Sequence, residues 1–126
     1  MKIRDIINLF EEEFASLMER FEVNDLSLDK VEDSTIGALN NPGVYVFWKD
    51  DKVIKVGRHL RFARKRALQH IKDNTGGKMK KLKGDPDAHL LLFNVKNFHD
   101  RHWVAALEIF LELRLKDEIE IRAHRL

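Results

Sequence analysis

The chain has 126 residues, 44% of them hydrophobic, which fits one compact domain with a modest core. It contains no cysteine, which excludes disulfides, thiolate metal sites and cysteine nucleophiles. No apolar run approaches the roughly 18 residues that span a bilayer, and the first residues lack the basic-then-apolar layout of a signal peptide. We therefore expect a soluble, cytoplasmic protein without a membrane partner.

The formal net charge of +2 hides an uneven distribution along the chain. Residues 1–52 hold 6 Lys/Arg against 12 Asp/Glu, residues 53–83 hold 11 against 1, and residues 84–126 hold 6 against 8. A basic block within an otherwise acidic protein attracts a polyanion locally, and nucleic acid is the commonest such partner. A solvated helix face neutralised by salt bridges is the alternative interpretation of the same block.

The first half of the chain begins with a predicted helix. Apolar residues recur at three- and four-residue steps from Ile3 to Phe21, which indicates an amphipathic helix with an acidic solvent face. Residues 24–41 are rich in Asp, Ser and Asn and predict a connection with room for one short element. The sequence Asn41-Pro42-Gly43 then predicts a turn, because proline fixes φ and glycine permits positive φ.

A hairpin and a basic helix are predicted next. Residues 44–48 and 53–57 are rich in β-branched and aromatic residues, and the charged turn 49–52 joins them. Residues 60–71 predict a helix with Phe62, Leu68 and Ile71 available for the core, ended by the glycines at 76 and 77. Residues 78–83 predict a basic loop or short helix.

The last third of the chain predicts a strand, a helix and an edge strand. Residues 88–95 form a short apolar run that suits a buried strand, and Asp100 is placed to cap a helix that continues to about Lys116. Residues 118–122 alternate charged and apolar types, as an edge strand does. The expected fold is α/β, with a small, mainly antiparallel three-stranded sheet flanked by helices. Residues 1–41 would be a helical extension and connector to one compact unit at 42–126.

The hairpin carries two tripeptides, Gly43-Val44-Tyr45 and Lys55-Val56-Gly57, with nine residues between Tyr45 and Lys55. They resemble the two halves of the GIY-YIG nuclease motif, and the resemblance covers residues 42–121. Each tripeptide is a weak signal alone, but their order and spacing are more specific. The hairpin is followed by Arg66 and His70 on one helix, an apolar strand, and a later helix that contains Glu108, as in that family.

The resemblance implies a metal-dependent endonuclease that hydrolyses phosphodiester bonds in DNA, with Tyr45, Lys55, Arg66, His70 and Glu108 as catalytic residues. It makes Glu108 the protein ligand of one Mg²⁺ or Mn²⁺, ions that favour hard oxygen ligands. Arg66 would bind phosphate through paired hydrogen bonds, and Tyr45 or His70 would take the proton from water. The i, i+4 spacing puts Arg66 and His70 on one side of their helix.

The sequence departs from the family pattern in the second tripeptide, where Lys55 stands in place of the usual tyrosine. Tyr45 is then the only phenol that the motif supplies, and a lysine at this point would contact phosphate or lower the pKa of a nearby phenol. One extra residue precedes Arg66, which leaves Arg64 and Lys65 as alternatives for its role. The asparagine often found beyond the glutamate-bearing helix has no counterpart between residues 116 and 126.

Several alternatives stay open. Glu112 lies one helical turn after Glu108 and is the alternative metal ligand. A non-catalytic nucleic-acid-binding domain of the same fold is the alternative function, and a protein-interaction module that uses the acidic N-terminal helix is a third. Target choice would depend on a partner protein, on dimerisation or on residues 1–41. In either nucleic-acid interpretation, DNA or RNA is expected to contact Arg58, Arg61, Arg64, Lys65, Lys72, Lys78, Lys80 and Lys81.

Overall fold

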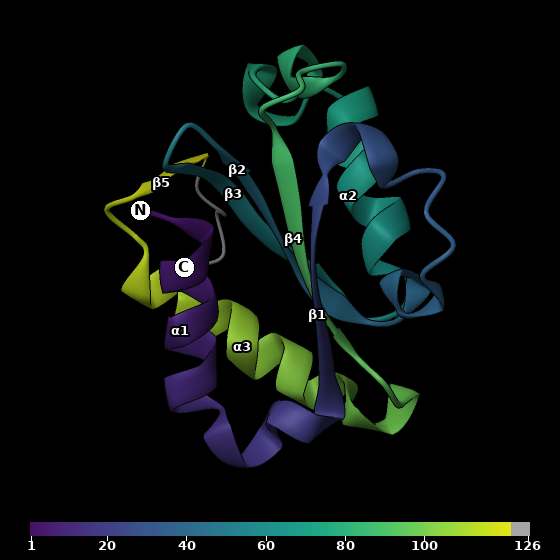
Figure 1. Cartoon of the computed structure of the whole chain (residues 1–126), viewed down its shortest axis with the longest axis vertical. Coiled ribbons are helices and arrows are strands. Elements are labelled where there is room, and N and C mark those ends of the chain that lie inside the picture. The colour runs from purple at the N-terminus through teal and green to yellow at the C-terminus, as the bar shows by residue number, and fades with distance from the viewer. Residues whose placement is uncertain (122–126) are drawn as a thin grey trace.

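The computed structural model, which describes residues 1–121, has one mixed sheet with helices on both sides (Figure 1). The strand order is β1-β4-β2-β3-β5, and every neighbouring pair is antiparallel except β3 and β5. The strands are β1 (Phe21–Ser27), β2 (Gly43–Lys49), β3 (Lys52–His59), β4 (His89–Val95) and β5 (Ile119–Ile121), and the α-helices are α1 (Ile3–Glu13), α2 (Ala63–Lys72) and α3 (Arg101–Arg114).

The α/β class is confirmed, but the sheet has five strands rather than the predicted three. The predicted N-terminal helix is too long: α1 ends at Glu13, and a 3₁₀ segment leads into β1 at Phe21. Apolar and polar residues alternate from Phe21 to Asn24, and β1 pairs with β4 along its whole length. Residues 1–41 thus contribute a strand to the sheet that carries the hairpin tripeptides.

The β2–β3 hairpin closes through a two-residue turn. Asp50 and Asp51 have φ of 50° and 62°, the left-handed values that a type I′ turn requires and that aspartate tolerates better than most residues. The register shifts between Phe47 and Trp48, so that Lys55 pairs with Phe47. Because cross-strand partners point to the same side of a sheet, this irregularity sets Lys55 on the side of Phe47 and Tyr45.

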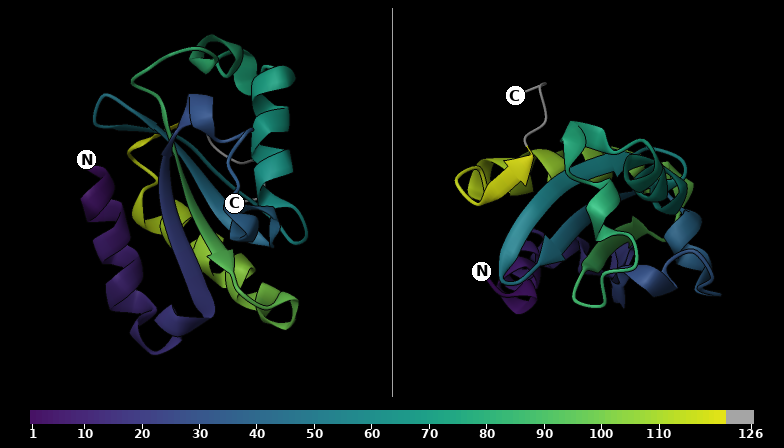
Figure 2. Two further views of the ribbon diagram at one scale, coloured as in Figure 1. Left: turned by 45° about the vertical axis from the view of Figure 1, so that its right-hand side comes forward. Right: turned by 90° about the horizontal axis from the view of Figure 1, so that it is seen from above.

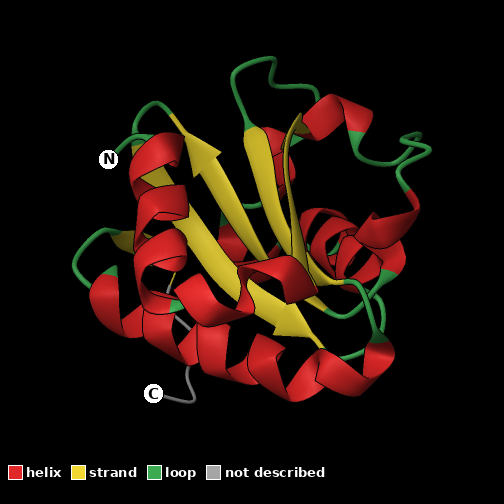
Figure 3. Ribbon diagram, turned by 60° about the horizontal axis from the view of Figure 1, so that its bottom comes forward, coloured by secondary structure: helices red, strands yellow, loops and turns green. Residues whose placement is uncertain are grey.

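Two cores lie on opposite sides of the sheet. The helices that cover them are seen on its two sides in Figures 2 and 3. On one side, the α3 face, α1 and α3 pack against alternate strand residues such as Val44 and Val56. On the other, the α2 face, α2 and several 3₁₀ segments cover Tyr45 and Phe47. Consecutive strand residues point to opposite faces, so Val44 and Tyr45 of one tripeptide belong to different cores.

The connector at residues 31–40 is fixed to α2 by Arg64. Its Nη1 donates to the backbone carbonyls of Val31 and Ser34 at 3.1 and 2.7 Å, and its Nε donates to Asn40 Oδ1 at 3.0 Å. Near the start of α3, Asp100 is the residue before the helix, as predicted, but its carboxylate accepts a hydrogen bond from Arg20 instead of capping the helix. Within residues 1–121, every helix is too short or too polar to cross a membrane.

Candidate functional site

The two glycines of the tripeptides lie where neighbouring atoms leave no space for a side chain. Gly57 pairs with Tyr45 across the hairpin, and a Cβ atom on Gly57 would lie 2.5 Å from Cε1 of Tyr45. A Cβ atom on Gly43 would lie 2.7 Å from the carbonyl oxygen of Phe93 in β4. Both distances are too short for real contacts, so close packing requires a glycine at each position. The phenol ring of Tyr45 lies directly over Gly57.

The hydroxyl of Tyr45 is part of a buried hydrogen-bonded chain that joins β2 to the last turn of α2. Tyr45 Oη lies 2.8 Å from His70 Nε2, and His70 Nδ1 lies 2.8 Å from Thr75 Oγ1. If Tyr45 donates to Nε2, the Nδ1–H donates to Thr75, and the reverse tautomer reverses both bonds. The arrangement therefore links a phenol, an imidazole and a hydroxyl through one ring.

The imidazole of His70 is held neutral. Burial lowers the pKa of His70 to about 4, helped by the positive charges of Arg66 and then Lys55. A neutral imidazole at pH 7 accepts a hydrogen bond from the phenol, but the lowered pKa makes His70 a weak base toward a phenol or water. The α2 face therefore brings Tyr45 and His70 into contact and keeps Arg66 and Lys55 close enough to act on His70 electrostatically.

Glu108, the fifth predicted catalytic residue, lies on the other side of the sheet. It projects from α3, has 0% of its surface exposed, and its Oε1 lies 2.6 Å from Arg58 Nη1. Arg58 pairs with Val44 in the hairpin and so shares the α3 face with it. Glu112, the alternative ligand, is also buried on α3. The structure does not gather the five predicted residues in one cleft.

The surroundings of Glu108 do not fit the expected divalent cation. Mg²⁺ bound through one carboxylate keeps several of its waters and needs space for them. Glu108 has no exposed surface, and the guanidinium of Arg58 already contacts one of its oxygens. Over residues 1–121, no three His, Cys, Asp or Glu side chains come together as a metal site. No chemical step through a metal at Glu108 follows from this geometry.

The predicted nucleic-acid-binding residues fall into two groups. Arg58 and Arg64 have structural partners, in Glu108 and in the connector respectively. The others have exposed side chains and form no ion pair with any carboxylate of residues 1–121: Arg61, Lys65, Lys72, Lys78, Lys80 and Lys81. The salt bridges that the alternative interpretation predicted are therefore not formed by these six cations within residues 1–121.

Some of these cations border a groove of about 620 Å³, here called the lysine groove, between the 3₁₀ turn at residues 28–30, α2 and residues 80–84. The groove is lined by lysines, by two acids of the 28–32 segment and by apolar residues. The lysines are Lys65, Lys72, Lys80 and Lys83, the acids are Asp29 and Glu32, and the apolar residues are Leu28, Leu68 and Ile71. Lys83 was not among the predicted contacts, and only its place in the basic block pointed to it.

Comparison with family models, curated proteins and solved structures finds no significant match. The residues of this chain and their geometry therefore carry the functional argument. Sequence reasoning missed Thr75, which extends the Tyr45–His70 chain, because a single threonine after a helix has no signature. It also missed Phe62, which was predicted to be a core residue and is 51% exposed.

Proposed function

We propose that this protein binds nucleic acid through the lysine groove and the exposed cations around it, on an α/β domain of the GIY-YIG type. The observation that carries the proposal is the set of exposed lysines and arginines between residues 61 and 83 that form no ion pair with any carboxylate of residues 1–121. A phosphate backbone supplies the matching anions at regular spacing, and each contact with a lysine releases a condensed counterion.

The shape of the groove supports a polyanion rather than a single small anion. Its lysines come from two separate segments, with Lys65 and Lys72 on α2 and Lys80 and Lys83 on the segment that follows. Asp29 and Glu32 make the opposite rim negative. A phosphate backbone would therefore lie against α2 and residues 80–83, with Leu68 beneath it available for contact with sugars or bases.

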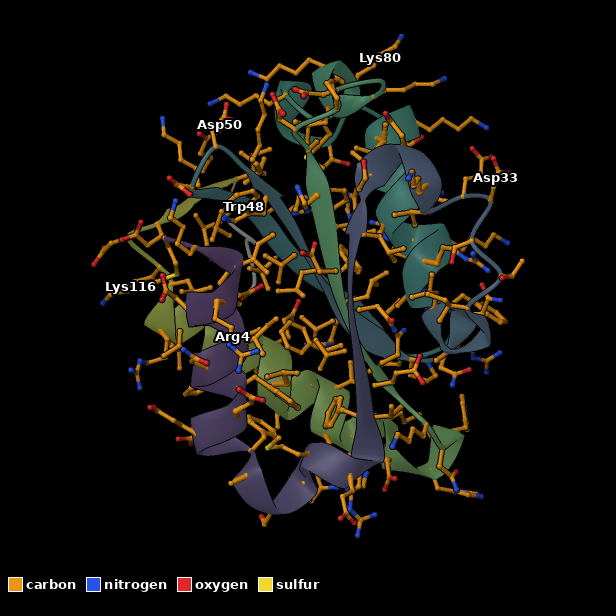
Figure 4. All side chains as sticks on the ribbon, viewed as in Figure 1. Arg4, Asp33, Trp48, Asp50, Lys80 and Lys116 are labelled. Carbon is orange, nitrogen blue, oxygen red and sulfur yellow. The ribbon has the colours of Figure 1, made fainter. Side chains whose placement is uncertain are left out.

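Fluorescence anisotropy with labelled DNA and RNA over a series of salt concentrations tests the proposal. Lys80→Ala removes a groove cation without touching the hydrogen bond that the Lys80 backbone N–H donates to Asn74. Lys116→Ala removes an equally exposed lysine from a separate part of the surface, where Figure 4 shows it. The slope of log affinity against log salt should fall by about 1 for Lys80→Ala and stay unchanged for Lys116→Ala. Affinity that does not depend on salt would refute the phosphate contacts.

A second candidate function, endonucleolytic hydrolysis of phosphodiester bonds in DNA with Mg²⁺ or Mn²⁺, is favoured by the Tyr45–His70 hydrogen bond. Neutral His70 would orient the Tyr45 hydroxyl through this bond, and Tyr45, once its proton had passed to solvent, would act as the base toward the attacking water. The cation of Arg66, which acts on His70, would then face the phosphate. This chemistry requires the buried pair to become accessible when substrate binds.

A plasmid-nicking assay with each metal separates the two functions. If the pair is catalytic, Tyr45→Phe should lower the cleavage rate by about 100-fold or more, a typical loss when a general base is removed. Glu108→Gln tests the metal role that the family resemblance implies, and circular dichroism shows whether each variant is folded. Nucleic-acid binding without cleavage by the unaltered protein would reject the second function and leave the first intact.

A further inference from the structure

Phe62 is an exposed aromatic residue with positively charged side chains near it. It immediately precedes α2, and 51% of its surface is exposed although it was predicted to pack in the core. The helix begins at Ala63, whose side chain is buried, so the chain turns at Phe62 and leaves the ring outside. Single exposed apolar residues are common, but this one lies beside an imidazole and several cations.

The turn that presents Phe62 is fixed by His59 at the end of β3. His59 Nδ1 accepts hydrogen bonds from the backbone N–H groups of Phe62 and Arg61 at 2.9 and 3.1 Å. The rings of His59 and Phe62 lie nearly parallel, with an interplanar angle of 21° and centroids 6.4 Å apart. The backbone at Phe62 is therefore held in place before any ligand arrives, which lowers the entropy lost on binding.

Three cations surround this turn. Partial burial lowers the pKa of His59, and the charges of Arg66, Arg61 and Lys65 lower it further, in that order. A neutral imidazole keeps Nδ1 available as the acceptor of both backbone hydrogen bonds. Arg61 precedes Phe62 directly and Lys65 and Arg66 lie in the first turn of α2, so the three cations are near the aromatic pair, where they would meet the phosphates on either side of a base.

Phe62 also lies near Arg66, which precedes the hydrogen-bonded His70 on α2 by one helical turn. Arg66 and His70 follow each other at a four-residue step along one side of α2, and the backbone N–H of Arg66 donates to the carbonyl oxygen of Phe62 at 3.1 Å. Arg66 acts electrostatically on both His59 and His70 and so lies near both. A nucleotide whose base covers Phe62 would place its phosphate beside Arg66.

We propose that Phe62 is a stacking platform for an unpaired base, so that the preferred ligand of this protein is single-stranded DNA or RNA, or an unpaired end or flap, with the adjoining phosphate on Arg66. This inference rests on the proposed nucleic-acid binding and names its substrate class. A base inside a duplex is stacked on both sides and offers no free face to an aromatic ring. The lysine groove, in contrast, contacts phosphates of paired and unpaired strands alike.

The test compares labelled oligothymidylate, oligouridylate and a duplex of equal length. Phe62→Leu keeps an apolar side chain and removes the ring, and Phe62→Trp keeps a ring. Leu113→Ala, in which an exposed apolar residue of α3 is shortened, is the matched control, since Leu113 is 57% exposed on the other side of the sheet. Phe62→Leu should weaken binding to both single strands on the order of tenfold and leave duplex binding unchanged.

The tryptophan variant gives further tests of the platform. Phe62→Trp should restore the single-strand affinity that Phe62→Leu loses. The fluorescence that its new indole adds to that of Trp48 and Trp103 should be quenched when a single strand binds. If Phe62→Leu binds single strands as well as the unaltered protein does, the platform is refuted while the lysine groove stands. If the unaltered protein binds none of the three probes, the proposed function fails as well.

Discussion

The contact between Gly57 and Tyr45 gives a sharp quantitative test of how the hairpin is packed. In Gly57→Ala, the new Cβ atom would lie 2.5 Å from Cε1 and 2.6 Å from both Cζ and Oη of Tyr45. Tyr45 is only 2% exposed and hydrogen-bonded to His70, so the ring has little room to move. Overpacking of this kind costs about 1–3 kcal/mol, and a weakened Tyr45–His70 bond adds about 1 kcal/mol. We expect a loss of about 2–4 kcal/mol in the free energy of unfolding.

The measurement is urea unfolding followed by circular dichroism and tryptophan fluorescence, with Gly37→Ala as the matched control. A Cβ atom on Gly37 would have no atom within 4 Å, so that substitution should be neutral or stabilise the protein by about 0.5 kcal/mol. A Tyr45→Leu background removes the ring, and there the cost of Gly57→Ala should fall below about 1 kcal/mol. Equal midpoints for Gly57→Ala and Gly37→Ala would refute the reasoning.

Two further predictions concern buried ionisable groups on the two faces of the sheet. Because the pKa of His70 is lowered to about 4, the unfolded chain binds a proton more readily than the folded one between about pH 6.5 and pH 4, and stability should fall by about 3 kcal/mol as pH decreases through that window. Urea unfolding at both ends of the window should show this loss, and His70→Gln should remove most of it. On the α3 face, Arg58→Met removes the guanidinium that pairs with Glu108, whose carboxylate has no exposed surface. The free energy of unfolding should fall by about 3 kcal/mol, because breaking a buried pair leaves a charge in the interior. Adding Glu108→Leu should recover part of this loss. If the double variant loses as much free energy of unfolding as Arg58→Met and Glu108→Leu lose together as single variants, the two side chains are not coupled.

Local patterns predicted the middle of the fold well. The hairpin, the helix after it, the apolar strand and the final edge strand all occur, because turn residues and alternation specify them within a few positions. The strand β1 was missed, since Phe14, Leu17, Met18 and Phe21 continue the helical spacing of α1. Its true partner is β4, and no local pattern around Phe21 shows a strand about 70 positions away.

The site could be predicted only where one element determines the geometry. The spacing of Arg66 and His70 put them on one side of α2, and the structure places His70 against Tyr45. The position of Glu108 depends on which side of the sheet α3 crosses, a tertiary property that composition and spacing do not encode. Phe62 was assigned to the core by its type alone, whereas the start of α2 one residue later turns its ring outward.

The closure of the β2–β3 hairpin has a consequence for the order of folding. A two-residue turn brings Tyr45 and Gly57 together at small entropic cost, whereas β1 must find β4 across a long stretch of chain, as the contact between Asp25 and His89, 64 positions apart, illustrates. We expect the hairpin to be formed in the transition state and β1, with α1, to dock later. Substitutions at Gly57 would then slow folding, while substitutions in β1 would mainly accelerate unfolding. The segment that bears both tripeptides would thus be the nucleus on which the rest of the sheet assembles.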